Sequence, residues 1–135
     1  MKVTLQTKAD KEFEVINETG NAVNIDMYEG DGKNHQSPTQ LLLSALSACA
    51  AVDIIPMIRK RRKTFVDLTS TVEGERREDH PRGFTKIHLH YEITSPDLTE
   101  EEAARIVELA TTKYCSVAAS LSARQTHSFS IKRPA

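Results

Sequence analysis

A long apolar stretch in the first half of the chain constrains the fold more than any other feature. It runs from Leu41 to Ile58 and contains Asp53 as its single charged residue. Apolar residues fall on nearly every side of the helix that this stretch predicts, and such a helix is normally buried all round. A chain of 135 residues has little core with which to surround it. The sequence therefore predicts a helix at a core shared by two copies of the chain.

The same stretch is almost long enough to cross a bilayer, and the basic run Arg59–Lys63 follows it as a cytoplasmic flank would. Ser44, Ser47 and several alanines make the stretch only mildly hydrophobic, and the rest of the chain is patterned as strands that need a core. We therefore expect a core helix and no membrane span. Residues 1–6 are already polar and do not resemble a secretory signal, so a cytoplasmic protein is expected.

The two ends of the predicted helix carry recognisable signals. Ser37 can cap the helix, Pro38 suits its first position, and Gln40 can bond back to the cap. Pro56 should kink the helix or make it restart. The run Arg59–Lys63 would then form a cationic last turn, for which a solvated helix end is a better interpretation than a nuclear signal or an anion site.

Alternating apolar and polar residues predict strands on both sides of the helix. Three short strands are expected within residues 2–27, joined as an antiparallel meander. Residues 66–73 and 84–94 predict a hairpin across the polar turn 76–83.

The last third of the chain predicts two more helices and a final strand. Thr99 and Glu102 form a capping box, a short helix is expected over 116–123, and Phe129 and Ile131 belong to the final strand. The element order is then β-β-β-α-β-β-α-α-β. This order predicts one α+β domain over residues 1–135, built with antiparallel sheets.

Composition excludes one broad class of function. Eighteen basic and nineteen acidic residues give a net charge of −1, whereas a general nucleic-acid-binding protein would carry a basic excess. Aromatic residues make up only 5% and there is no Trp, so the core is expected to be aliphatic.

The chain has two cysteines, Cys49 and Cys115, and each lies within an apolar helical pattern. Cytosolic proteins rarely keep structural disulfides, and a free Cys is often a small buried hydrophobic residue. The pair is therefore either two inert core residues or a redox couple.

Three stretches resemble the OsmC/Ohr family of bacterial thiol peroxidases: SPTQLLLSALSAC at 37–49, HPRGFTKI at 80–87 and KYCSVAASL at 113–121. The match is closest to the uncharacterised OsmC-like branch. The resemblance implies an intertwined homodimer in which antiparallel sheets wrap around long central helices. It also implies that Cys49 attacks a hydroperoxide and becomes a sulfenic acid, that Cys115 resolves it to a disulfide, and that an external dithiol reduces the disulfide. No bound cofactor is implied.

The chain departs from the peroxidase pattern at two positions. The active peroxidases have a Glu ten residues before the first cysteine, where this chain has Thr39. They also use an Arg from the N-terminal strands to hold the thiolate, and this chain has no Arg before Arg59. The resemblance therefore assigns only Cys49 and Cys115.

The surroundings of Cys49 do not by themselves favour a thiolate. Cys49 lies beyond the reach of the positive helix start, and Asp53, one turn later on the same face, opposes ionisation. A cation would have to come from elsewhere, such as Arg124, His35 or the partner chain.

Cys115 has the more favourable local surroundings. If a helix begins at Ser116, its N–H groups point at the sulfur, and Lys113 is close in sequence. Local chemistry thus favours Cys115 as the thiolate, whereas the resemblance makes Cys49 the attacking group. We follow the resemblance.

Other polar residues have simpler structural interpretations. Asp53 is expected to pair with a base or a helix terminus or to be protonated, and Gln40 and Thr39 belong to the helix start. His88 and His90 share one strand face and could bind a metal, but Lys86 and Glu92 on that face indicate a solvated surface. No metal site is expected.

The leading hypothesis is a thiol-dependent organic hydroperoxide reductase that acts in oxidative stress defence as a cytoplasmic homodimer. An apolar pocket lined by Leu42 and Leu46 would suit organic peroxides. The alternatives are a binding protein for small apolar ligands that has lost peroxidase activity, and a redox sensor.

Overall fold

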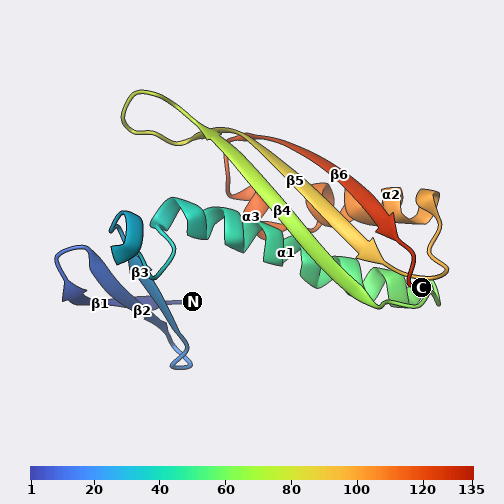
Figure 1. The fold of residues 1–135 in the computed structure, drawn as a ribbon, viewed down its shortest axis with the longest axis horizontal. Coiled ribbons are helices and arrows are strands. Elements are labelled where there is room, and N and C mark those ends of the chain that lie inside the picture. The colour runs from blue at the N-terminus through green and yellow to red at the C-terminus, as the bar shows by residue number, and fades with distance from the viewer. The chain divides into compact units, whose positions relative to one another are not determined.

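Two three-stranded sheets and one long helix make up most of the structure, a computed structural model that describes all of residues 1–135 (Figure 1). Residues 1–42 and 43–135 form two compact units, and the long helix α1 (Pro38–Lys60) belongs to both. The mixed helix and sheet content confirms the predicted α+β class, and the element order is the expected one. A single domain over 1–135 remains a prediction.

The first unit contains the predicted antiparallel meander, made of β1 (Val3–Ala9), β2 (Glu12–Asn17) and β3 (Ala22–Asp26). Gly20 has a positive φ of 83° in the turn before β3, a conformation that suits glycine. This meander confirms the strand pattern expected within residues 2–27.

A buried carboxylate organises the segment between β3 and α1, which includes the short 3₁₀ helix η1 (Gly30–Gly32). Asp26 accepts the backbone N–H groups of Asn34 and His35, both at 2.8 Å, and pairs with the Lys33 ammonium at 3.0 Å. Although burial alone would raise its pKa, these partners lower the pKa of Asp26 to about 2. Asp26 therefore ties the loop that leads into α1 to the end of the meander.

The start of α1 has the expected reciprocal cap. The Ser37 N–H donates to Gln40 Oε1 at 2.9 Å, and the Gln40 N–H donates to Ser37 Oγ at 3.3 Å. The helix continues through Pro56, so a restart at Pro56 is wrong. Proline removes the N–H that would reach the carbonyl of Val52, but both residues lie on the exposed side, where water can bond to that carbonyl.

The second unit contains the other sheet and the remaining helices. In chain order its elements are β4 (Asp67–Arg76), β5 (Phe84–Thr94), α2 (Glu100–Glu108), the π-helix η2 (Leu109–Lys113), α3 (Ser116–Ala119) and β6 (Arg124–Lys132). The capping box of Thr99 and Glu102 is confirmed at the start of α2.

The sheet of this unit corrects the expectation of purely antiparallel sheets. β4 and β5 form the predicted antiparallel hairpin, but β6 lies parallel to β5. Three helical segments separate β5 from β6, and a long helical crossover returns the chain in the same direction. The second sheet is therefore mixed, in the order β4-β5-β6.

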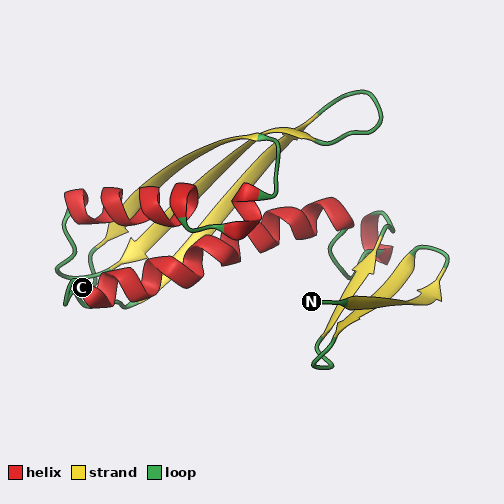
Figure 2. Cartoon of the chain, turned by 180° about the vertical axis from the view of Figure 1, so that it is seen from behind, coloured by secondary structure: helices red, strands yellow, loops and turns green.

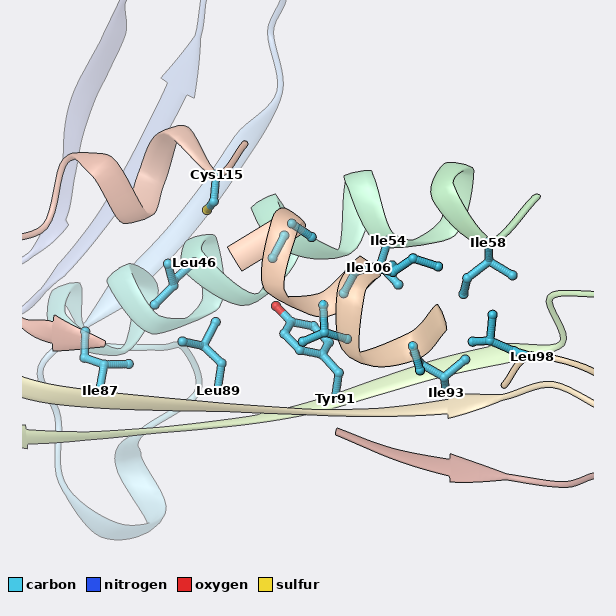
Figure 3. Close-up of a cluster of buried hydrophobic side chains, with 14 residues drawn as sticks. Leu46, Ile54, Ile58, Ile87, Leu89, Tyr91, Ile93, Leu98, Ile106 and Cys115 are labelled. Carbon is cyan, nitrogen blue, oxygen red and sulfur yellow. The ribbon is translucent and has the colours of Figure 1, made fainter. Parts of the chain in front are cut away.

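Helices α1 and α2 cover one face of this sheet (Figure 2). Alternate residues of β5 point into the core, and every fourth residue of α1 meets them there (Figure 3). The buried members on these two elements are Ile87, Leu89, Tyr91, Ile93, Leu46, Ala50, Ile54 and Ile58.

The single chain buries only one face of α1. Leu42 is 42% and Val52 70% exposed on the outward side. By length and composition α1 could cross a membrane, but its inner face packs on the sheet as that of a core helix does. Burial of α1 all round, which the sequence predicted, thus requires something beyond the single chain.

Candidate functional site: a pair of thiols in the second unit

The fold brings together the two cysteines, which are 66 residues apart in the sequence. Cys49 lies half-buried in the middle of α1, whereas Cys115, 4% exposed, precedes α3 at its N-cap position. Both are free thiols, and they lie close enough for Cys49 to contribute to the raised pKa of Cys115. Figure 3 shows Cys115 with its sulfur directed into the core.

Backbone groups hold the Cys115 sulfur. The N–H of Ala118 donates to Sγ at 3.3 Å, and the nearby N–H of Val117 also acts to lower the pKa of the thiol. These contacts match the geometry expected for a cysteine at a helix start. Burial is nevertheless the largest influence, and together with Cys49 it raises the pKa of Cys115 above its ordinary value. The expectation that local groups make Cys115 a ready thiolate is therefore wrong.

The main influences on the pKa of Cys115 include no cation. Lys113 instead lies over the ring of Tyr114, with its Nζ 5.4 Å from the ring centroid. Arg124 is exposed at the start of β6, and His35 lies in the other unit. Of the cations considered from the sequence, neither Lys113 nor Arg124 therefore acts as a main influence on the buried thiol.

Tyr91 is a polar neighbour of the thiols that sequence reasoning missed. Its ring is fully buried, and its hydroxyl donates to the backbone carbonyl of Ser47 in α1 at 2.8 Å. Burial is the main reason that the pKa of Tyr91 rises to about 12, and electrostatic interactions with Cys115 and Cys49 raise it further. The sequence offered one signal for a buried hydroxyl near the helices: Tyr91 is the one polar residue among the aliphatic inward positions of β5.

A pocket of about 350 Å³ lies in the second unit, and neither cysteine is among its lining residues. It is lined by Asp53, Pro56, Met57, Lys60, Leu109 and Tyr114. Asp53 lies one helical turn after Cys49, and Tyr114 immediately precedes Cys115. The pocket thus combines an apolar lining with one carboxylate, one ammonium and one phenol.

The pocket differs from the predicted one. Leu46, expected in its lining, is 1% exposed within the core, and Leu42 is exposed at the end of the first unit. Asp53 was expected to pair with a base or a helix terminus or to be protonated. The structure places it half-buried in the pocket lining, together with Lys60.

The two strand histidines belong to a hydrogen-bonded row on the other face of the sheet. His88 contacts Thr126 Oγ1 at 2.7 Å and Ser128 Oγ at 2.9 Å, and His90 contacts Ser128 Oγ at 2.7 Å. Both rings are half-buried, so the expectation of a simply solvated surface is corrected. No group of three His, Cys, Asp or Glu side chains is arranged to hold a metal ion.

The remaining candidates have structural contacts. Gln40 takes part in the cap of α1, and Thr39 is half-buried in its first turn. Arg59 lies 5.4 Å from the ring centroid of Phe65, and Lys63 pairs with Glu102 at 3.6 Å. These contacts fit the interpretation of Arg59–Lys63 as a helix end.

Comparisons with known proteins agree on one family. Residues 30–130 match the model of the OsmC-like protein family. The chain is 36% identical over 118 residues to Protein YhfA of Escherichia coli strain K12, covering 86% of this chain and 88% of that protein.

Solved structures share the fold. An OsmC-like protein from Mycoplasma pneumoniae superposes with a TM-score of 0.81 at 21% identity, covering 99% of this chain and 96% of that one. The organic hydroperoxide resistance protein OhrB of Bacillus subtilis gives a TM-score of 0.62 at 18% identity, covering 97% and 96%. At these identities the likeness concerns the fold.

Proposed function

Because the chain belongs to the OsmC-like family, we propose that it is a thiol-dependent organic hydroperoxide reductase that uses Cys49 and Cys115. The observation that supports this proposal is the proximity of the two thiols, one on α1 and one at the start of α3, since Cys49 contributes to the raised pKa of Cys115. Two free thiols that lie close together can give up two electrons by forming one disulfide.

The reaction would begin at Cys49, which is the more exposed of the two sulfurs. Its thiolate attacks one oxygen of the hydroperoxide, the O–O bond breaks, and the alkoxide leaves and takes up a proton to become an alcohol. Cys49 is then a sulfenic acid. The Cys115 sulfur attacks the Cys49 sulfur, the S–O bond breaks, and the oxygen leaves as water. An external dithiol reduces the resulting disulfide and is itself oxidised.

The organic part of the substrate is proposed to bind in the pocket of the second unit, whose lining is near the two cysteines in sequence. Pro56, Met57 and Leu109 provide apolar surface, and about 350 Å³ is within the range of small-molecule sites. The similar fold of an organic hydroperoxide resistance protein from Bacillus subtilis supports a role in defence against oxidative stress. The chemistry resides in sulfur, so the proposal requires no bound cofactor and no metal.

The outward face of α1 supports a homodimer. Leu42 and Val52 are exposed on a helix that is apolar along nearly its whole length. A second copy is the occupant that the family resemblance implies, and it would also be a source of the missing cation. We propose a soluble cytoplasmic protein with no nucleic-acid partner and no membrane span.

The test is turnover of an organic hydroperoxide by the reduced protein, with cumene hydroperoxide as substrate and a small dithiol as reductant. We expect peroxide consumption that saturates with substrate. Cys49→Ser should reduce it to the rate of the dithiol alone. In the absence of the dithiol, Cys115→Ser should react once with the peroxide and leave Cys49 as a trapped sulfenic acid. Wild-type turnover no faster than that of Cys49→Ser would contradict the proposal.

A second function is favoured by the raised pKa of Cys115 and by the lack of a cation among its main influences. Together with Thr39 in place of the family's glutamate, these features fit a protein that binds a small apolar ligand in the pocket without reducing peroxide. A redox sensor would form the disulfide without sustained turnover. Ligand binding that persists in the Cys49→Ser variant, in the absence of peroxidase turnover, would favour the binding protein.

A further inference from the structure

Cys49 lies in α1 and Cys115 at the start of α3, so a disulfide between them requires these two elements to keep a fixed separation. A disulfide needs Cβ atoms roughly 3.5–4.5 Å apart, so a shift of about 1 Å between α1 and α3 is enough to disfavour it. The backbone N–H of Ala118 donates to the Cys115 sulfur at 3.3 Å and holds it at the start of α3. The position of Cys49 depends on how α1 is held along its own axis against the sheet.

The buried face of α1 offers little that would stop it from sliding. Its buried residues are all aliphatic: Leu46, Ala50, Ile54 and Ile58. Apolar contacts of this kind are non-directional, whereas a hydrogen bond fixes both a distance and an angle. A directional bond near Cys49 would therefore define the position of the helix.

Tyr91 makes such a bond. It projects from β5 into the core (Figure 3), and its hydroxyl donates to the carbonyl of Ser47 at 2.8 Å. Ser47 is two residues before Cys49, within the same turn of α1. The phenol also interacts electrostatically with both cysteines, so it lies in the same part of the core as the thiol pair.

We propose that Tyr91 is a positioning residue for the thiol pair, which fastens the turn of α1 that carries Cys49 to β5 and so sets the separation of Cys49 from Cys115. It acts through the helix backbone and not on the substrate. This inference rests on the proposed function only in its use of the Cys49–Cys115 disulfide.

The experiment measures how readily the disulfide forms, without peroxide. The full-length protein is equilibrated with mixtures of reduced and oxidised glutathione, quenched, and its free thiols are counted. The ratio gives the equilibrium constant of the Cys49–Cys115 disulfide against glutathione. Tyr91→Phe keeps the ring and removes the hydroxyl, and Tyr28→Phe makes the same change at a tyrosine of the first unit.

We expect Tyr91→Phe to lower this constant by about three- to tenfold, the usual value of one hydrogen bond, and Tyr28→Phe to leave it within about twofold. Replacement of Tyr91 by 4-aminophenylalanine, which keeps a donor at the same place, should restore it. If Tyr91→Phe does not fold, the 4-aminophenylalanine variant still tests the proposal. Loss of the disulfide in that variant, which keeps a donor at the position, would contradict the proposal.

The melting temperature of each reduced variant separates positioning from stability. A lower melting temperature with an unchanged disulfide constant in Tyr91→Phe would overturn the proposal and leave Tyr91 as a core residue only. If the wild-type protein forms no disulfide in any mixture, both this inference and the two-cysteine mechanism fail. Normal disulfide formation without peroxide turnover would contradict the proposed function alone.

Discussion

Two buried side chains, Cys115 and Asp26, differ in how their hydrogen-bond partners affect their pKa values. Two backbone N–H groups act to lower the pKa of Cys115, but burial outweighs them and raises it. Asp26 is also buried, yet several N–H groups and an ammonium overcome that burial and lower its pKa to about 2. The contrast shows why a helix start alone does not predict a reactive thiol: the number and charge of the donors decide.

Asp26 gives a prediction about acid stability. Its pKa in the folded state, about 2, lies below the ordinary value of 3.8, so its ionised form stabilises the loop between β3 and α1 above pH 3.8. That stabilisation should be lost as the pH falls from about 4 to 2. The protection factors of the Asn34 and His35 amides, which are corrected for the intrinsic exchange rate at each pH, should fall over this range.

The matched variants are Asp26→Asn and Asp31→Asn, since Asp31 is exposed in the same loop. Asp26→Asn should give rapid exchange at Asn34 and His35 already at pH 7, whereas Asp31→Asn should behave like the wild-type protein. Equal protection in both variants would show that the carboxylate does not hold the loop.

Structural features formed by residues close in the sequence could be predicted, whereas features formed by contacts between distant segments could not. The caps at Ser37 and Thr99 use partners three residues away, and both were predicted. The parallel pairing of β6 with β5 was not, because it depends on the path of the chain through the intervening helices. Strand alternation revealed which residues of β5 face inward but not that Tyr91 reaches α1.

The candidate site divides in the same way. The types of residue and the helical setting of each cysteine were readable from the sequence, and their function as a pair came only from the family resemblance. The pocket lining could not be predicted from the sequence. It combines one side of α1 with Leu109 of η2 and with Tyr114, which lie about 50 residues later in the chain. Those residues carry no motif that would have identified them.

β4 contains a position where only a glycine fits. A Cβ at Gly74 would lie 2.5 Å from Cε1 of Phe84 and 3.3 Å from Cδ2 of Leu43. Gly74→Ala should therefore force the Phe84 ring to move and lower the free energy of unfolding by about 1–3 kcal/mol. Urea unfolding of the reduced protein measures this change.

Gly83→Ala is the control, because a Cβ there meets nothing within 4 Å. It should change the free energy of unfolding by less than about 0.5 kcal/mol. Equal stability of the two variants would mean that Phe84 adapts without cost.

The assembly state of the whole molecule follows from the uncovered side of α1. Large exposed apolar surfaces mark interaction sites, and Val52 is 70% exposed at the middle of this helix. We expect the protein to sediment at twice the mass of the chain at micromolar concentration. Val52→Asp should shift it toward the mass of a single chain, because the dimer would have to bury the new carboxylate.

Val66→Asp introduces the same change at an exposed valine outside α1 and should leave the dimer intact. A wild-type protein that sediments as a monomer at all accessible concentrations would contradict the dimer. The missing cation near the thiols would then have to come from within the chain.

The central claim is that Cys49 and Cys115 act together as a two-electron couple driven by an organic hydroperoxide. The most direct measurement adds one equivalent of cumene hydroperoxide to the reduced protein and counts free thiols over seconds. Loss of both thiols, faster than in free glutathione and abolished in Cys49→Ser, is the predicted result. If both thiols persist as long as those of glutathione, the two cysteines are not a peroxidase couple.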